Sequence, residues 1–151
     1  MTSTNIEVAR RWFEEMWNQG RAELISELLA PDAPIYDIGA PGEVRRGPEG
    51  FRPVYEKLRG AFPDIRFTIE EIVSERDIVA LRWTARMTHR GPHLGFAPTD
   101  AAVTVGGMGF ARVRNGQVVE AWNSWDQLAL LQQTGVIPAP QAEDRFLSAK
   151  V

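Results

Sequence analysis

The first third of the chain places apolar residues three or four positions apart, which is the spacing of amphipathic helices. This spacing predicts three helices, over residues 5–20, 21–30 and 48–62. Thr4 or Asn5 can cap the first helix, Pro31 ends the second, and Pro48 suits the first turn of the third. A short strand is predicted over residues 33–38, before a loop rich in glycine and proline.

From residue 65 onward the pattern changes to strand alternation. Four strands are predicted, over residues 65–73, 77–89, 103–114 and 118–124. A polar loop, Ser74-Glu75-Arg76, joins the first two, and Asn115-Gly116 closes a two-residue hairpin between the last two. Asp126 caps a final helix that Gly135 ends. Helices followed by an antiparallel meander indicate an α+β fold with the helices on one face of a curved sheet.

Strand alternation also sorts side chains into an inner and an outer face. On the 103–114 strand, Gly107 and Gly109 share a face with its valines, and glycines inside a strand mark either a bend or a close approach of another group. On the next strand, unbroken alternation puts Val119, Ala121 and Asn123 on one side. If that side faces inward, Asn123 either points its amide into a hollow or is satisfied by backbone groups.

Composition narrows the classes of function. The chain has 151 residues, 44% of them hydrophobic, and a net charge of -3 that gives no reason to expect a nucleic-acid partner. It has no cysteine, and His89 and His93 are its only histidines, so a zinc site has almost no ligand set. No apolar run is long enough for a membrane helix and no signal peptide is evident, so a cytoplasmic protein is expected.

Three side chains could supply acid or base chemistry. Asp37 follows the first strand and Asp126 precedes the last helix, and each is either a loop or cap residue or a carboxylate in a pocket. His89 ends an apolar strand face and is either a hydrogen-bonded core residue or a titrating group in the pocket.

Aromatic residues recur at positions that face the interior, and together with the strand glycines they favour a hollow cone over a solid core. The predicted pocket residues are Phe13, Trp17, Tyr36, Phe51, Tyr55, Trp83, Met87, Phe96, Gly109 and Trp125. Met108, Phe110 and Trp122 fall on the outer face instead, where an apolar patch predicts a homodimer through the sheet.

Several motifs resemble one family. They are Trp-Asn-Gln-Gly after the first helix, Gly-Pro-Glu-Gly-Phe at the third, Arg-Trp-Thr-Ala-Arg, Gly-Phe-Ala-Pro-Thr, and the ending that runs from Asn-Gly-Gln-Val through Trp-Asn-Ser-Trp-Asp-Gln to Leu-Leu-Gln-Gln. The order resembles SnoaL-like polyketide cyclases, of the superfamily of nuclear transport factor 2 and ketosteroid isomerase. The resemblance implies a cystatin-like α+β barrel over residues 1–137, a tail over residues 138–151, dimers, and a ligand pocket without metal or cofactor.

The resemblance also implies site residues. In the cyclases an Asp on the last strand acts as acid and base beside a His on the preceding strand, and these positions hold Asn123 and Gly109 here. The general-base Asp of the ketosteroid isomerases matches Asp37, while their oxyanion-hole Tyr falls on Phe13. The chain therefore lacks the acid and base pair of the cyclases and the oxyanion-hole Tyr of the isomerases.

Two functions are therefore expected. The first is a cofactor-independent enzyme, an aldol-type cyclase, isomerase or hydrolase, in which Asp37, Asp126 or His89 moves a proton and Asn123 positions an oxygen of a hydrophobic substrate. The alternative is a non-catalytic protein of the same fold that binds a hydrophobic small molecule.

Overall fold

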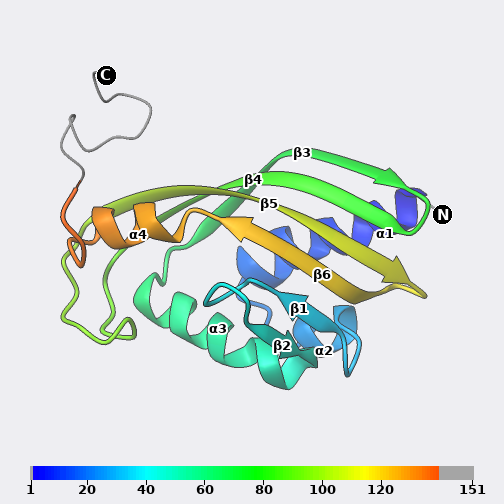
Figure 1. The fold of residues 1–151 in the computed structure, drawn as a ribbon, viewed down its shortest axis with the longest axis horizontal. Coiled ribbons are helices and arrows are strands. Elements are labelled where there is room, and N and C mark those ends of the chain that lie inside the picture. Colours follow the sequence, from blue (N-terminus) through cyan, green and yellow to red (C-terminus); the bar gives the residue numbers. More distant parts are fainter. Residues whose placement is uncertain (1, 140–151) are drawn as a thin grey trace.

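The structure is a computed structural model that describes residues 2–139, and it has the expected α+β architecture (Figure 1). A six-stranded sheet with the strand order β2-β1-β6-β5-β4-β3 curves over the helices of the first half of the chain. The tail predicted from residue 138 lies, from residue 140 on, outside the described residues.

The helical half follows the periodicity of the sequence, with two differences. The helices are α1 (Thr2–Arg10), the π-helical segment η1 (Arg11–Trp17) that continues it, α2 (Leu24–Leu28) and α3 (Gly47–Ala61). The cap prediction was wrong because α1 already begins at Thr2, and the Asn5 amide instead donates to the carbonyl of Arg76. The π-helical turns were not predicted. Every helix within residues 2–139 is too short or too polar to span a bilayer.

The strands are β1 (Pro34–Tyr36), β2 (Val44–Arg46), β3 (Arg66–Glu75), β4 (Ile78–Thr88), β5 (Ala102–Arg114) and β6 (Gln117–Trp125), and α4 (Gln127–Gln133) follows them. The prediction missed β2. It also assumed an antiparallel sheet, whereas β1 pairs with β6 in parallel, so the sheet is mixed. The loop predicted over residues 74–76 is a two-residue turn, Arg76-Asp77, in which Arg76 has a positive φ of 56°.

The hairpin between β5 and β6 fixes which side chains point inward. Asn115 and Gly116 have φ angles of 53° and 77°, which confirms the tight turn. A bulge at Arg112/Val113 then breaks the alternation, so that Val118 is buried where unbroken alternation had placed Val119. Beyond the bulge, Asn123 pairs with Gly109 and Trp125 with Gly107 on the concave face.

The helices are attached to the sheet by aromatic packing and by one polar clip. The Trp17 ring lies 5.0 Å from the Tyr55 ring and 5.2 Å from the Phe67 ring, measured between centroids. One residue later, the Asn18 amide donates to the Phe67 carbonyl (2.9 Å) and accepts from the Phe67 N–H (2.7 Å). The clip holds the end of η1 against β3, and it thereby fixes the side chains of η1 over the sheet.

Candidate functional site

Two adjoining cavities lie between η1, α3 and the concave face of the sheet. Counted as the space open to the centre of a water-sized sphere, they measure about 80 Å³ and about 70 Å³. The same five residues line both cavities: Trp12, Phe13, Ile38, Trp83 and Asn123. We call these five residues the waist, and the spaces on either side of it the first lobe and the second lobe.

The π-helical segment supplies two neighbouring residues to the waist. A π-helical turn is wider than an α-helical one and is often found at functional sites. Trp12 and Phe13 are adjacent in sequence, yet both line the cavities. The Trp12 ring packs 4.8 Å from the Phe51 ring, and the Phe13 ring packs 5.3 Å from the Phe67 ring. Helical periodicity alone selected Phe13 and missed Trp12.

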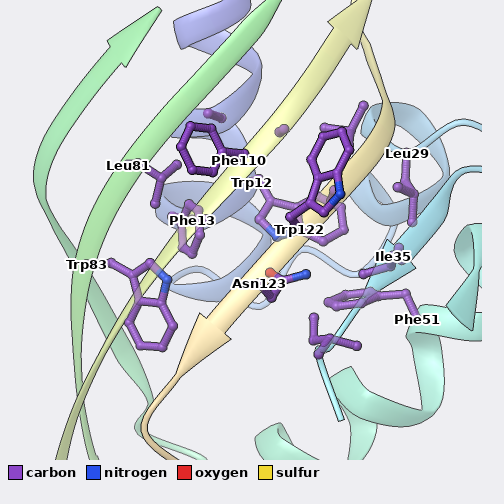
Figure 2. Close-up of a pocket in the computed structure, with 16 residues that line it drawn as sticks. Trp12, Phe13, Leu29, Ile35, Phe51, Leu81, Trp83, Phe110, Trp122 and Asn123 are labelled. Atoms are coloured by element: carbon purple, nitrogen blue, oxygen red, sulfur yellow. The ribbon is translucent and has the colours of Figure 1, made fainter. Parts of the chain in front are cut away.

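Asn123 is the one amide side chain in the cavity wall of the described residues (Figure 2). Its Nδ2 donates to the Tyr36 carbonyl at 3.0 Å, and this bond fixes which way the amide points. Its Oδ1 accepts no hydrogen bond from residues 2–139. A Cβ on residue 109 would lie 3.9 Å from this Oδ1, so Gly109 leaves the space beside it open.

The loop after β1 is held in the wall by side chains of β6 and α4. Trp125 Nε1 donates to the Ile38 carbonyl at 3.0 Å, and Gln127 Nε2 donates to the Gly39 carbonyl at 2.6 Å. With the Asn123 bond to Tyr36, these donors extend the contact between β1 and β6 beyond their two backbone pairs. Ile38 is therefore kept in the waist by residues of the neighbouring strand.

Most of the predicted pocket residues line one or both lobes: Phe13, Trp17, Phe51, Trp83, Met87, Gly109 and Trp125. Tyr36, Tyr55 and Phe96 line neither lobe. Tyr36 stacks on Trp122 on the outer face, and Tyr55 is buried with its hydroxyl directed at the Met16 carbonyl. Burial raises the pKa of Tyr55 above its ordinary value, so this hydroxyl stays neutral.

Neither candidate carboxylate lines a cavity. Asp37 is exposed, has a positive φ of 57°, and accepts a hydrogen bond from the Gly42 N–H at 2.7 Å. Asp126 is exposed and caps α4 by accepting from the Ala129 N–H at 2.9 Å. Each carboxylate has a local structural partner, and neither belongs to the wall of a lobe.

His89 is fully buried but lies outside both lobes. Its ring sits between Phe62 and Phe96, at centroid distances of 5.6 Å and 5.0 Å. The Thr99 N–H donates to Nδ1 at 3.2 Å, which ties the loop after β4 to the core. This is the core interpretation of the two that the sequence left open, and Phe96 covers this histidine instead of the cavity.

The resulting site is uncharged. Within residues 2–139, no Asp, Glu, His, Lys or Arg lines either lobe, and no cluster of three His, Asp or Glu could hold a metal ion. The polar atoms of the waist are the Asn123 amide and the indole N–H groups of Trp12 and Trp83. Such a wall can surround an apolar molecule and hydrogen-bond one oxygen of it, but it offers no group that titrates near neutrality.

One family model matches most of the chain. The sequence profile described as SnoaL-like polyketide cyclase matches residues 7–134. Comparison with curated proteins gave no match.

Three solved structures of similar fold are two proposed polyketide cyclases and one proposed hydroxylase. IdmH of Streptomyces antibioticus, a proposed polyketide cyclase, is 33% identical, with 87% of this chain and 98% of that chain aligned at a TM-score of 0.75. AclR of Streptomyces galilaeus, a proposed hydroxylase, is 26% identical over 93% of this chain and 87% of that chain, at a TM-score of 0.82. A proposed polyketide cyclase of Acidithiobacillus ferrooxidans is 26% identical over 87% and 94% of the two chains, at a TM-score of 0.76.

Proposed function

The chain belongs to the SnoaL-like polyketide cyclase family, and from this premise we propose that it binds a hydrophobic small molecule carrying an oxygen, without a cofactor, in the cavity around Asn123. The observation that carries the proposal is the unused Oδ1 of Asn123 in a wall that is otherwise almost entirely apolar. An apolar molecule gains from leaving water, and a hydroxyl on it can donate to this oxygen.

Replacing Asn123 by leucine tests the proposal. The wild-type protein is expected to bind phenol about tenfold more tightly than toluene, since one hydrogen bond contributes ~1 kcal/mol or slightly more. In Asn123→Leu this preference should fall to about one, because leucine keeps the branched shape of the side chain and removes the acceptor. Titration calorimetry, or quenching of the fluorescence of the cavity tryptophans, measures both affinities.

The ratio of the two affinities is the readout because a general loss of stability would weaken both ligands alike. Gln133→Leu is the matched control, since the Gln133 amide also bonds to backbone groups, at Thr104, but lies outside the cavities. A preference for phenol that survives in Asn123→Leu would overturn the assignment of Asn123.

Turnover of the bound molecule is the second candidate, favoured by the family match. Ring closure or isomerisation through an enol needs a base and a group that stabilises the enolate oxygen. Asn123 Nδ2 and the indole N–H groups of the waist are hydrogen-bond donors that suit stabilisation of an enolate oxygen. Asp37 directly precedes the waist residue Ile38, so a rearrangement of this loop is the shortest way to bring a carboxylate to the cavity.

The variants Asp37→Asn and Asp126→Asn separate the structural role of each carboxylate from a role in proton transfer. Asparagine keeps the hydrogen bonds to the Gly42 and Ala129 N–H groups but loses the charge. With aromatic polyketide esters and small ketones as substrates, a loss of about 100-fold in kcat for Asp37→Asn, with unchanged melting temperature, is expected if this carboxylate is the base. Equal turnover in the wild type and both variants would remove these carboxylates from the mechanism.

We also propose that the chain forms a homodimer through the outer face of the sheet. Met108, Phe110 and Val73 are 61%, 55% and 65% exposed on this face. Arg66 and Arg86 lie directly opposite each other at one end of the β3–β4 pair, both exposed.

Within residues 2–139, neither arginine forms an ion pair with an acidic residue, and the exposed Glu75 at the other end of β3 forms none with a basic residue. A two-fold axis near the middle of the face would bring opposite ends of two copies together, with these charges complementary and the apolar residues covered.

A further inference from the structure

We infer that the cavity takes an elongated ligand with an apolar ring in each lobe and an oxygen at mid-length, and that Gly107 sets the width of the waist through Trp83. This inference rests on the proposed function, because it specifies which molecule the same cavity selects. The binding proposal names neither the shape of the ligand nor a role for Gly107.

The two lobes are apolar and of similar size. The first is lined by groups such as Leu29, Ile35 and Val118, and the second by groups such as Leu58, Met87 and Leu130. A water molecule needs roughly 10–15 Å³ of such space, so each lobe has room for about five waters. Five waters occupy about the same volume as one six-membered carbon ring. One ring in each lobe fills the cavity, and the link between the rings must pass the waist.

The polar atoms are concentrated at the waist. Asn123 Oδ1 is an acceptor without a donor, and no hydrogen bond joins the indole N–H of Trp12 or Trp83 to another group of the described residues. In Figure 2 the nitrogen-bearing edge of the Trp83 indole faces Asn123. A hydroxyl between the two rings of a ligand can donate to Asn123 and accept from an indole, whereas a hydroxyl at the far end of a ring would lie unpaired in an apolar lobe.

Trp83 forms the side of the waist opposite Asn123, and its position depends on Gly107. The two residues pair across β4 and β5, and a Cβ on residue 107 would overlap Cζ2 of Trp83 and lie 2.8 Å from Cβ of Trp125. The Phe67 ring packs edge-on to the Trp83 indole at 5.0 Å. An added methyl group at residue 107 therefore drives the indole away from the strand and into the waist.

Two isomers test the ligand shape. Benzhydrol has a hydroxyl on the carbon between two phenyl rings, and 4-benzylphenol has the same atoms with the hydroxyl at one end. Calorimetric titration of the wild-type protein should give an affinity for benzhydrol at least about tenfold higher, since the misplaced hydroxyl loses its hydrogen bonds. Equal affinities, or tighter binding of 4-benzylphenol, would overturn the inference.

Gly107→Ala tests the positioning role, with Gly106→Ala as the control on the same strand. A Cβ on residue 106 would project from the outer face, and its nearest neighbour is the Trp83 carbonyl at an ordinary 3.7 Å. Gly107→Ala should weaken benzhydrol about tenfold and leave benzyl alcohol, its one-ring counterpart, within about twofold, because one ring needs only one lobe. Gly106→Ala should change neither affinity.

A purely structural effect of Gly107→Ala would weaken the one-ring and two-ring ligands alike, and that result contradicts the role assigned to Gly107. If Gly107→Ala does not fold, Trp83→Phe serves as the test instead. The smaller phenylalanine ring widens the waist and removes the indole N–H. The preference for benzhydrol over 4-benzylphenol should then fall at least threefold, and an unchanged preference counts against the waist.

The same titrations separate this inference from the binding proposal. Binding of both isomers with no preference leaves the binding proposal intact and removes the inference. Failure of phenol, benzyl alcohol and both isomers to bind at all removes the binding proposal itself.

Discussion

Replacing Phe51 by alanine is expected to lower the free energy of unfolding by about 3 to 5 kcal/mol. Phe51 is fully buried, and its ring lies 4.8 Å from Trp12 and 5.9 Å from Trp17. It joins α3 to η1, so its removal unpacks two helical segments at once. The value should lie toward the lower end of the range because one side of the ring already faces the first lobe.

Phe51→Leu is the companion variant. Leucine keeps most of the apolar contact, so the loss should be about 1 kcal/mol. Urea unfolding followed by tryptophan fluorescence measures both variants, with equal m-values as the check that the unfolding transition is the same. A loss below ~1 kcal/mol for Phe51→Ala would mean that the ring is not part of a packed wall.

Replacing Phe110 by glutamate is expected to convert a dimer into a monomer. Phe110 pairs with Trp122 across β5 and β6 in the middle of the proposed interface. Covering a carboxylate there without a partner disfavours association strongly, so the dimer dissociation constant should rise at least about 100-fold. Light scattering should give twice the chain mass of 16.9 kDa for the wild type and one chain mass for the variant.

Leu128→Glu is the matched control, because Leu128 is also 55% exposed but lies on α4 and not on a strand of the sheet. It should remain a dimer. A monomeric wild type, or a Phe110→Glu variant that is still dimeric, would contradict the proposed interface.

The sequence predicted the fold well wherever one face of an element is buried. Apolar spacing located α2 and α3, and alternation located β4 and β5, because burial on one side leaves a periodic trace in the sequence. The exposed three-residue strand β2 carries no such trace, and the parallel pairing of β1 with β6 joins residues far apart in the chain. Both depend on tertiary contacts that periodicity does not record.

Local irregularities explain the remaining differences. The bulge at Arg112/Val113 shifts the inner face by one residue, so Val118 is buried, and its effect ends before Asn123, whose inward position was predicted from alternation. The π-helical turns bring Trp12 into the cavity, and no short-range sequence signal for them was recognised. Gly109 was expected to leave a hollow, while Gly107 instead accommodates the Trp83 indole.

The candidate acid and base residues show the limit of residue type as a guide. Asp37, Asp126 and His89 have the chemistry that proton transfer needs, but each makes a local hydrogen bond and none lines the cavity. Residue type predicted which side chains could transfer a proton, whereas the hydrogen-bond partners determine where each side chain lies. Any catalytic role of these three residues, and of Asn123, therefore stays a prediction.

The central claim is that a largely apolar cavity with Asn123 in its wall receives an oxygen-bearing molecule. A crystal structure of the wild-type chain soaked with benzhydrol tests it most directly. The ligand is expected between η1 and the concave face of the sheet, with its hydroxyl at about 2.5–3.0 Å from Asn123 Oδ1. Lobes filled by Trp12, Phe13 or Trp83 themselves, with benzhydrol only on the outer surface, would contradict it.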